Sequence, residues 1–249
     1  MSGHSKWATI RRKKEKIEAA RGKVFTKLIR ELQIAARDGS DPNANPRLRS
    51  AVDAAKAVNM PAANIERAIK KGAGESDGAA YEEVTYEGYG PGGVAVMIEC
   101  VTDNRNRTVG EVRHCFTKRN GTMAEAGAVA WMFDRLGRLT LDGAQGSEDE
   151  IMEIALESGA RDVKGDSDGW EILTDPENLY KVKSAVEGHG KRVESAELAY
   201  VPKNTIKVED ASQAKSLLGL VEALEELDDT QQVHANFEMD DSLMESIAG

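Results

Sequence analysis

The sequence contains few of the residues that build disulfide frameworks and zinc sites: two cysteines and four histidines among 249 residues. Two cysteines cannot form a disulfide framework, and no histidine stands at zinc-ligand spacing from either of them. Cys100 and Cys115 both lie among apolar neighbours, which favours buried, reduced thiols in a cytoplasmic protein. The sequence therefore predicts a protein without a metal or any other cofactor.

Long hydrophobic runs are also absent. No stretch approaches the roughly 20 apolar residues that an α-helix needs to cross a bilayer. The basic N-terminus, MSGHSKWATIRRKKEK, has no apolar h-region after it, so it does not resemble a secretory signal. It also lacks the broad apolar face of a helix that lies on a membrane surface. We expect no membrane partner.

Motifs of catalysis and nucleotide binding are missing as well. The GYGPGG segment 88–93 has the letters of the dinucleotide-binding fingerprint, but a predicted strand follows it and Pro91 removes a donor amide. We interpret it as a hairpin turn, and a contact with another molecule stays open. The histidines are scattered, and none stands near a serine or cysteine in a recognisable catalytic context: His4, His114, His189 and His234. The sequence predicts a protein that is not an enzyme.

What the sequence does have is a sharp separation of charge. Residues 1–72 contain 17 Lys and Arg against 7 Asp and Glu, a formal charge of +10. Residues 73–249 contain 16 against 36, a formal charge of −20. A basic end on an acidic body is typical of a protein that binds a polyanion with one end only. Nucleic acid is the partner that this pattern favours.

The basic residues are densest before residue 24, and they continue as a stripe along the first predicted helix, with Arg37 at its end. Trp7 stands among them as a group on which a base can stack. The alternative is a solvated charged face, which the clustering and the acidic remainder disfavour. We predict nucleic-acid contacts from Lys6, Trp7, Arg11, Arg12, Lys13, Lys14, Lys16, Arg21, Lys23, Lys27 and Arg30.

A second polar segment, TDNRNRT at residues 102–108, begins another predicted helix. Exposed amides at a helix start attract anions, and this one also carries two arginines and two asparagines. An ordinary capped helix with solvated arginines explains the pattern equally well. With that alternative open, we predict a secondary contact from Tyr89, Asn104, Arg105, Asn106, Arg107 and Arg113.

The hydrophobic pattern divides the N-terminal part into a tail and a helical domain. Residues 1–22 are polar and only weakly periodic, so we expect a basic tail that is mobile without its partner. Residues 23–78 contain three amphipathic segments, which predict a three-helix domain. Asn45 is a typical N-cap for the second helix, and Pro61 begins the third.

Beyond residue 78 the pattern alternates and predicts an α+β fold. Residues 138–202 show the order βαββαβ of an inserted ferredoxin-like domain. A lone helix and strand cannot bury their own apolar surface, so we expect 203–249 to complete a discontinuous α/β domain, also ferredoxin-like, with 79–137. We expect the strands of this second domain at 83–87, 94–101, 127–133 and 233–237, and its helices at 104–119 and after Asp210.

Several long motifs resemble the YebC family: GHSKWATIRRKK, RGKVFTKLIRELQIAAR, DPNANPRLR, YEGYGPGG and DNRNRTVGEVRH. This family includes PmpR-type transcriptional regulators and the mitochondrial translational activator of cytochrome c oxidase. The resemblance covers essentially the whole chain and implies a helical N-terminal domain followed by two α/β domains. It also implies a role in gene expression, as a DNA-binding regulator or as a ribosome-associated factor that helps translation through difficult sequences such as proline runs.

We therefore predict a non-catalytic, cytoplasmic, nucleic-acid-binding regulator of gene expression, with DNA-binding transcriptional regulation as the first interpretation. No helix-turn-helix pattern stands out, because the third helix is short and carries few base-reading side chains. A translation factor that binds ribosomal RNA is the first alternative, since an acidic body with a basic arm suits structured RNA surrounded by proteins. The second alternative is a protein-interaction scaffold. The acidic domains would contact proteins or a ribosomal surface.

Overall fold

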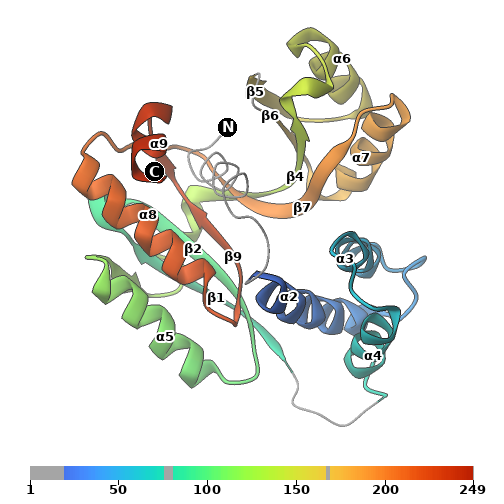
Figure 1. Ribbon diagram of the computed structural model, residues 1–249, viewed down its shortest axis with the longest axis horizontal. Helices are drawn as coiled ribbons and strands as arrows, with labels where there is room; N and C mark the ends of the chain where they lie inside the picture. Colours follow the sequence, from blue (N-terminus) through green and yellow to red (C-terminus); the bar gives the residue numbers. More distant parts are fainter. Residues whose placement is uncertain (1–19, 76–80, 167–168, 249) are drawn as a thin grey trace.

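The protein is an α+β molecule in which a helical unit and two α/β units lie side by side (Figure 1). The computed structural model describes residues 20–75, 81–166 and 169–248. The architecture confirms the predicted fold class.

In the N-terminal part that the structure describes, residues 20–75, three α-helices pack together: α2 (Ala20–Ala35), α3 (Pro46–Ala57) and α4 (Ala62–Gly72). The predicted cap is confirmed, because Asn45 Oδ1 accepts from the Leu48 amide at 3.0 Å. The amide group of Asn45 also donates to Ala35 O at 2.7 Å, so one side chain fixes the end of α2 and the start of α3. Leu32, Leu48 and neighbouring alanines are buried between the helices.

The first α/β unit is built around a four-stranded antiparallel sheet with the strand order β3-β1-β2-β9. Its elements are β1 (Glu82–Tyr89), β2 (Ala95–Thr102), α5 (Arg105–Lys118), β3 (Thr122–Ala124), α8 (Ala211–Glu225) and β9 (Thr230–Ala235). The second unit is formed by residues 133–202, which lie between β3 and α8 in the chain, so it interrupts the first.

The second α/β unit has the strand order β5-β6-β4-β7, again antiparallel throughout. Its elements are β4 (Phe133–Asp142), α6 (Glu148–Ser158), β5 (Asp162–Asp166), β6 (Gly169–Thr174), α7 (Leu179–Gly188) and β7 (Val193–Pro202). This is the ferredoxin-like arrangement, in which β6 lies between the two strands of the first split βαβ unit, β4 and β5, and β4 lies between the two strands of the second, β6 and β7. The first sheet has the same arrangement, with β3, β1, β2 and β9 in the places of β5, β6, β4 and β7. The difference is that β1, which occupies the place of β6, comes first in the chain of this unit.

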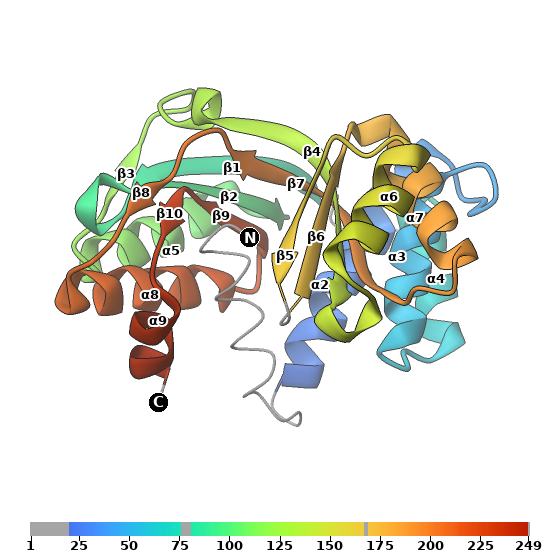
Figure 2. The ribbon, with the colours of Figure 1, turned by 90° about the horizontal axis from the view of Figure 1, so that it is seen from above.

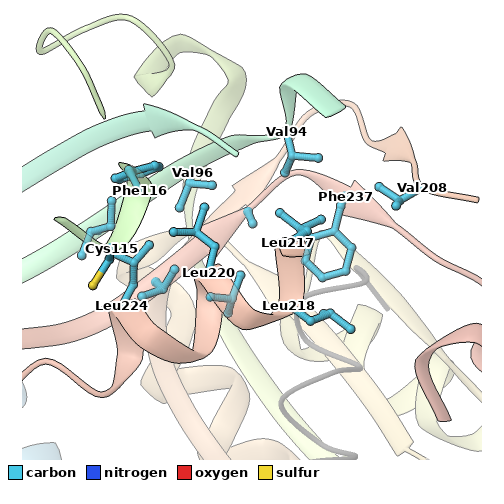
Figure 3. Close-up of a cluster of buried hydrophobic side chains, with 14 of the residues drawn as sticks. Val94, Val96, Cys115, Phe116, Val208, Leu217, Leu218, Leu220, Leu224 and Phe237 are labelled. Atoms are coloured by element: carbon cyan, nitrogen blue, oxygen red, sulfur yellow. The ribbon is translucent and has the colours of Figure 1, made fainter. Parts of the chain in front are cut away.

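The sheet of the first unit is buried on both faces. Helices α5 and α8 cover one face, and the segment that leads into β4 crosses the other (Figure 2). On the helical side, Phe116 of α5 and leucines of α8 pack on Val96 (Figure 3). Gly88 of β1 leaves room for this aromatic ring, since a Cβ there would lie 2.5 Å from Phe116 Cζ. Burial on both faces explains why residues 94–98 are apolar without alternation.

The predicted strand at 127–133 is wrong. Strand β3 of the sheet lies earlier, at Thr122–Ala124, and a short 3₁₀ turn (Ala130–Met132) stands where the strand was expected. The buried carboxylate of Glu87 accepts the amides of Gly127, Val129 and Ala130 at 2.6, 2.6 and 2.9 Å. These amides therefore bind a side chain instead of a neighbouring strand, which the local apolar pattern did not reveal.

The predicted final strand is interrupted at Asn236. The backbone amide of Asn236 donates to Ala95 O at 3.1 Å, and its side-chain Oδ1 accepts from Ala95 N at 2.7 Å. Beyond it, β10 (Phe237–Glu238) pairs in parallel with β8 (Ile206–Lys207). A last helix, α9 (Asp241–Ala248), packs against α8 and was not predicted.

Within the described residues, no helix is both long and apolar enough to cross a membrane.

Candidate nucleic-acid interface

Much of the predicted basic tail lies outside the described residues: Lys6, Trp7, Arg11, Arg12, Lys13, Lys14 and Lys16. Arg21 belongs to the first turn of α2, but its side chain is not described. Among the basic side chains predicted to contact nucleic acid, those that the structure describes begin at Lys23.

Three basic residues of α2 point toward the C-terminal end of α8, which lies beside the start of α2 (Figure 1). Lys23 Nζ donates to Glu226 O at 3.5 Å, and Lys27 Nζ donates to Glu225 O at 2.7 Å. Arg30 donates to the carbonyl oxygen of Asp228. We call Lys23, Lys27 and Arg30 the α2 stripe. The structure thus places it against the protein itself.

The partner of the α2 stripe is strongly negative. The last carbonyl groups of a helix have no partner within it, and the helix dipole adds partial negative charge at that end. Residues 222–229 (EALEELDD) add five carboxylates at the same place, and we call them the acidic segment. Acidic side chains at a helix C-terminus are unfavourable unless cations compensate them. The α2 stripe supplies those cations.

Asp229 holds the centre of this contact. Its side chain is 1% exposed and lies 3.0 Å from Arg30 and 2.7 Å from Arg107. Thr102 and Thr108 also donate to Asp229 Oδ2, at 3.0 and 2.6 Å. Burial by itself raises the pKa of Asp229, but the hydrogen bonds from Thr108, Arg107 and Thr102 and the charge of Arg30 outweigh it and lower the pKa. The carboxylate is thus held in its charged form.

Asp229 therefore brings together Arg30 and Arg107, which the sequence placed in two separate predicted contacts. Nothing in the sequence singled out Asp229. The signal that could have found it is the acidic segment at the end of an amphipathic helix, where five carboxylates require basic partners.

The rest of the secondary set is divided between structural roles and solvent. Asn104 caps α5 by accepting from the Arg107 amide at 3.1 Å. Arg105 forms an exposed ion pair with Glu82 at 2.9 Å. Asn106 and Arg113 are exposed on α5, and Tyr89 donates to Ala128 O at 3.2 Å from a half-buried position. The N-cap supports the capped-helix interpretation, and Arg105, Asn106 and Arg113 stay accessible to a partner.

The basic residues of the helical unit outside the α2 stripe fall into two groups. Arg47 binds Glu31 and Glu83 at 2.8 and 2.6 Å, Arg37 donates to Tyr81 O, and Lys71 lies over the Tyr81 ring. These residues connect the helical unit to the start of β1. The second group is exposed and comprises Arg49, Lys56, Arg67 and Lys70. This group leaves the helical unit with cations at its surface.

The glycine-rich turn after β1 has a structural explanation. Gly92 and Gly93 adopt positive φ angles of 78° and 74°, which favour glycine. A Cβ at Gly92 would lie 2.4 Å from Gln213 Nε2 in the first turn of α8. The turn therefore packs closely on α8, and the predicted hairpin is confirmed.

Candidates for metal binding and thiol chemistry are few. In the part of the chain that the structure describes, no three His, Cys, Asp or Glu side chains gather as metal ligands. Burial raises the pKa of the Cys100 thiol to about 12 and also raises that of Cys115. Both thiols are buried and free, and they stay protonated at neutral pH.

Comparisons with known proteins match the chain along nearly its full length. A family model described as the second and third domain of TACO1/YebC matches residues 81–237, and one described as the TACO1/YebC N-terminal domain matches residues 5–75. A "Probable transcriptional regulatory protein" of Desulfotalea psychrophila is 54% identical over 249 residues, all of both chains. One from Geobacter sulfurreducens is 55% identical over 248 residues, 99% of this chain and all of the relative.

A solved structure agrees with these relatives. The crystal structure of a conserved hypothetical protein from Aquifex aeolicus is 50% identical to this chain and superimposes with a TM-score of 0.85, covering 91% of this chain and 93% of that one. Motifs, family models and relatives therefore give one answer, and the chain belongs to the TACO1/YebC family.

Proposed function

We propose that this protein is a non-catalytic regulator of gene expression that binds nucleic acid through its basic N-terminal part, with regulation of transcription as its process. The observation that carries the proposal is the separation of charge, +10 in residues 1–72 and −20 in residues 73–249. Its relatives bear the name "Probable transcriptional regulatory protein", which supports the same process.

The arrangement of charge favours contact with phosphates. Six Lys and Arg residues precede residue 20, and the helical unit adds exposed cations at Arg49, Lys56, Arg67 and Lys70. Nucleic-acid affinity of this kind comes from counterion release and carries no sequence information by itself. Helix α4 has only 11 residues, and the described part of the chain presents no obvious helix for reading bases in a groove.

A binding measurement with a charge-reversed tail tests the phosphate contact. Changing Arg11, Arg12, Lys13 and Lys14 to Glu should abolish binding to a labelled mixed-sequence DNA duplex at 150 mM salt. If four phosphate contacts are lost, the slope of log K against log salt becomes shallower by about 3.6, the counterion release of four contacts. Undiminished affinity would contradict the proposal.

The matched control reverses four exposed lysines of the α/β units, namely Lys164, Lys181, Lys207 and Lys215. It changes the net charge equally, so its affinity should fall much less than that of the tail variant. Equal losses in the two variants would show that only total charge matters and that the tail is not a binding site.

The type of nucleic acid is decided in cells. Crosslinking followed by sequencing should recover promoter DNA if the protein regulates transcription. Enrichment of one contiguous site in ribosomal RNA, with little promoter DNA, would replace this process by translation. A pulled-down complex that survives nuclease treatment would instead identify a protein scaffold.

A further inference from the structure

We propose that the acidic segment occupies the α2 stripe as an internal substitute for phosphate, and that nucleic acid displaces it from Lys23 and Lys27. This inference rests on the proposed function and adds a regulated second phosphate site to the tail. Arg30 stays bound to Asp229 and serves as the fixed point about which the contact opens.

The first argument is the chemistry of the contact. The three residues of the α2 stripe lie at positions i, i+4 and i+7, so they share one face of α2. That face meets carbonyl oxygens at the negative end of α8 among five carboxylates of the acidic segment. A phosphodiester backbone offers the same features, a row of anionic oxygens. Both ligands need the same Lys23 and Lys27 ammonium groups.

The second argument is mutual exclusion. Glu226 and Asp228 are exposed beside the α2 stripe and would lie next to any phosphate bound there. Like charges at such short range repel strongly. Nucleic acid can therefore use Lys23 and Lys27 only when the acidic segment has moved away from them.

The third argument is a gradient of strength along the stripe. Lys23 is exposed and makes a long 3.5 Å contact, and Lys27 is half-buried at 2.7 Å. The side chain of Arg30 is 10% exposed and forms an ion pair with the buried Asp229. Exposed pairs separate at little cost, whereas breaking a buried pair is costly. Opening therefore begins at the N-terminal end of α2, next to the basic tail.

The contact consequently sets a threshold for binding. Tail contacts hold the nucleic acid near residue 20, and Lys23 and Lys27 add to the affinity once the acidic segment leaves. We call the protein closed when the acidic segment lies against Lys23 and Lys27. The observed affinity for nucleic acid is reduced by the fraction of molecules that are closed, so a change that weakens the closed state raises the observed affinity.

Neutralising the two lysines tests whether they contact phosphate. In the full-length Lys23→Gln/Lys27→Gln variant, two fewer counterions should be released on binding the DNA duplex, so the salt slope should be shallower by about 1.8. Between 50 and 200 mM salt, wild-type affinity should then fall about 12-fold more than that of the variant. An unchanged slope would overturn the inference.

Neutralising the acidic segment tests displacement. The variant Glu226→Gln/Asp228→Asn should bind the duplex several-fold more tightly than the wild type. The control Glu153→Gln/Glu157→Gln removes two exposed carboxylates of α6 and has the same net charge, so it should bind like the wild type. Equal tightening in the control would show a general charge effect and overturn the inference.

Combining the two changes makes the test specific. In the Lys23→Gln/Lys27→Gln background, neutralising Glu226 and Asp228 should no longer tighten binding, because the lysines that they block are absent. Tightening that persists would overturn displacement.

The wild type and the tail variant separate the two proposals. If wild-type protein binds and tail reversal abolishes binding, but the lysine variant keeps the wild-type slope, only the second phosphate site is refuted. If wild-type protein shows no salt-dependent binding, the proposed function itself is refuted.

Discussion

Replacement of Asp229 by Asn should be among the most damaging changes to a single carboxylate in this protein. The carboxylate accepts hydrogen bonds from Arg107, Thr102 and Thr108 and forms an ion pair with Arg30, and its side chain is 1% exposed. Asn removes the charge and replaces one acceptor oxygen with a donor group that faces two cations. Breaking a buried ion pair from one side costs about 3–5 kcal/mol.

The lower end of that range applies here, because both arginines keep other partners. Arg107 still has Asp103 at 2.9 Å, and Arg30 still donates to Asp228 O and lies over the Tyr81 ring. We therefore expect the free energy of unfolding to fall by about 3 kcal/mol. For a chain of this size, the thermal midpoint should fall by about 6–12 °C.

Urea denaturation of the variant and of Asp228→Asn measures the effect. Asp228 is exposed, so its substitution should change the free energy of unfolding by no more than about 0.5 kcal/mol. The two variants make the same change, Asp to Asn, at neighbouring positions of the chain, and they differ in the burial of the side chain. Equal effects of the two substitutions would refute the assignment of Asp229 as the centre of the contact.

The pH dependence gives a second signature. The folded-state pKa of Asp229 is lowered, so its contribution to stability is fully present above the ordinary value of about 3.9 and is lost as the pH falls through the folded-state pKa. Stabilities of the wild type and of Asp229→Asn should therefore differ most near neutral pH and converge in acid. A difference that stays constant below pH 4 would contradict this reasoning.

Four further predictions concern the first α/β unit. Gly88→Ala should destabilise the protein by about 1–3 kcal/mol, because the new methyl group would overlap the aromatic ring of Phe116. Gly110→Ala, at an exposed helical position with no atom within 4 Å of the new Cβ, should stabilise it by about 0.8 kcal/mol, and thermal melts compare the two. At pH 7 the Cys100 thiol should react with a thiol reagent only as fast as the protein opens, because its side chain is buried and a reagent cannot reach it in the native state. Burial also raises its pKa to about 12, which keeps the thiolate fraction low, and rapid reaction of Cys100 in the native state would refute this. Glu87→Gln should cost about 1–3 kcal/mol in urea, because a neutral amide with one acceptor oxygen cannot replace a carboxylate that binds three amides, whereas Glu125→Gln, which is exposed, should have little effect.

Local signals in the sequence predicted most of the fold. Asn45 caps α3, as expected from its place before an apolar periodic segment. The strand and helix order of residues 138–202 also sufficed to predict the ferredoxin-like sheet. Capping and amphipathic periodicity act within one element, so they can be read from the chain directly.

The 127–133 segment shows where local reading fails. Its apolar residues fit a strand, yet the amides of Gly127, Val129 and Ala130 bind the carboxylate of Glu87, 40 or more residues earlier in the chain. An amide that binds a distant side chain cannot also pair with a strand. Only the tertiary structure reveals that choice.

The candidate interface divides in the same way. The sequence by itself determined that the N-terminal part is basic and the remainder acidic, because charge depends on composition alone. Tertiary structure decided which cations meet an internal partner, since Arg30 and Arg107 are 77 residues apart in sequence and converge on Asp229. Charge is a property of the residues, whereas the pairing of charges depends on distances that only the packed helices fix.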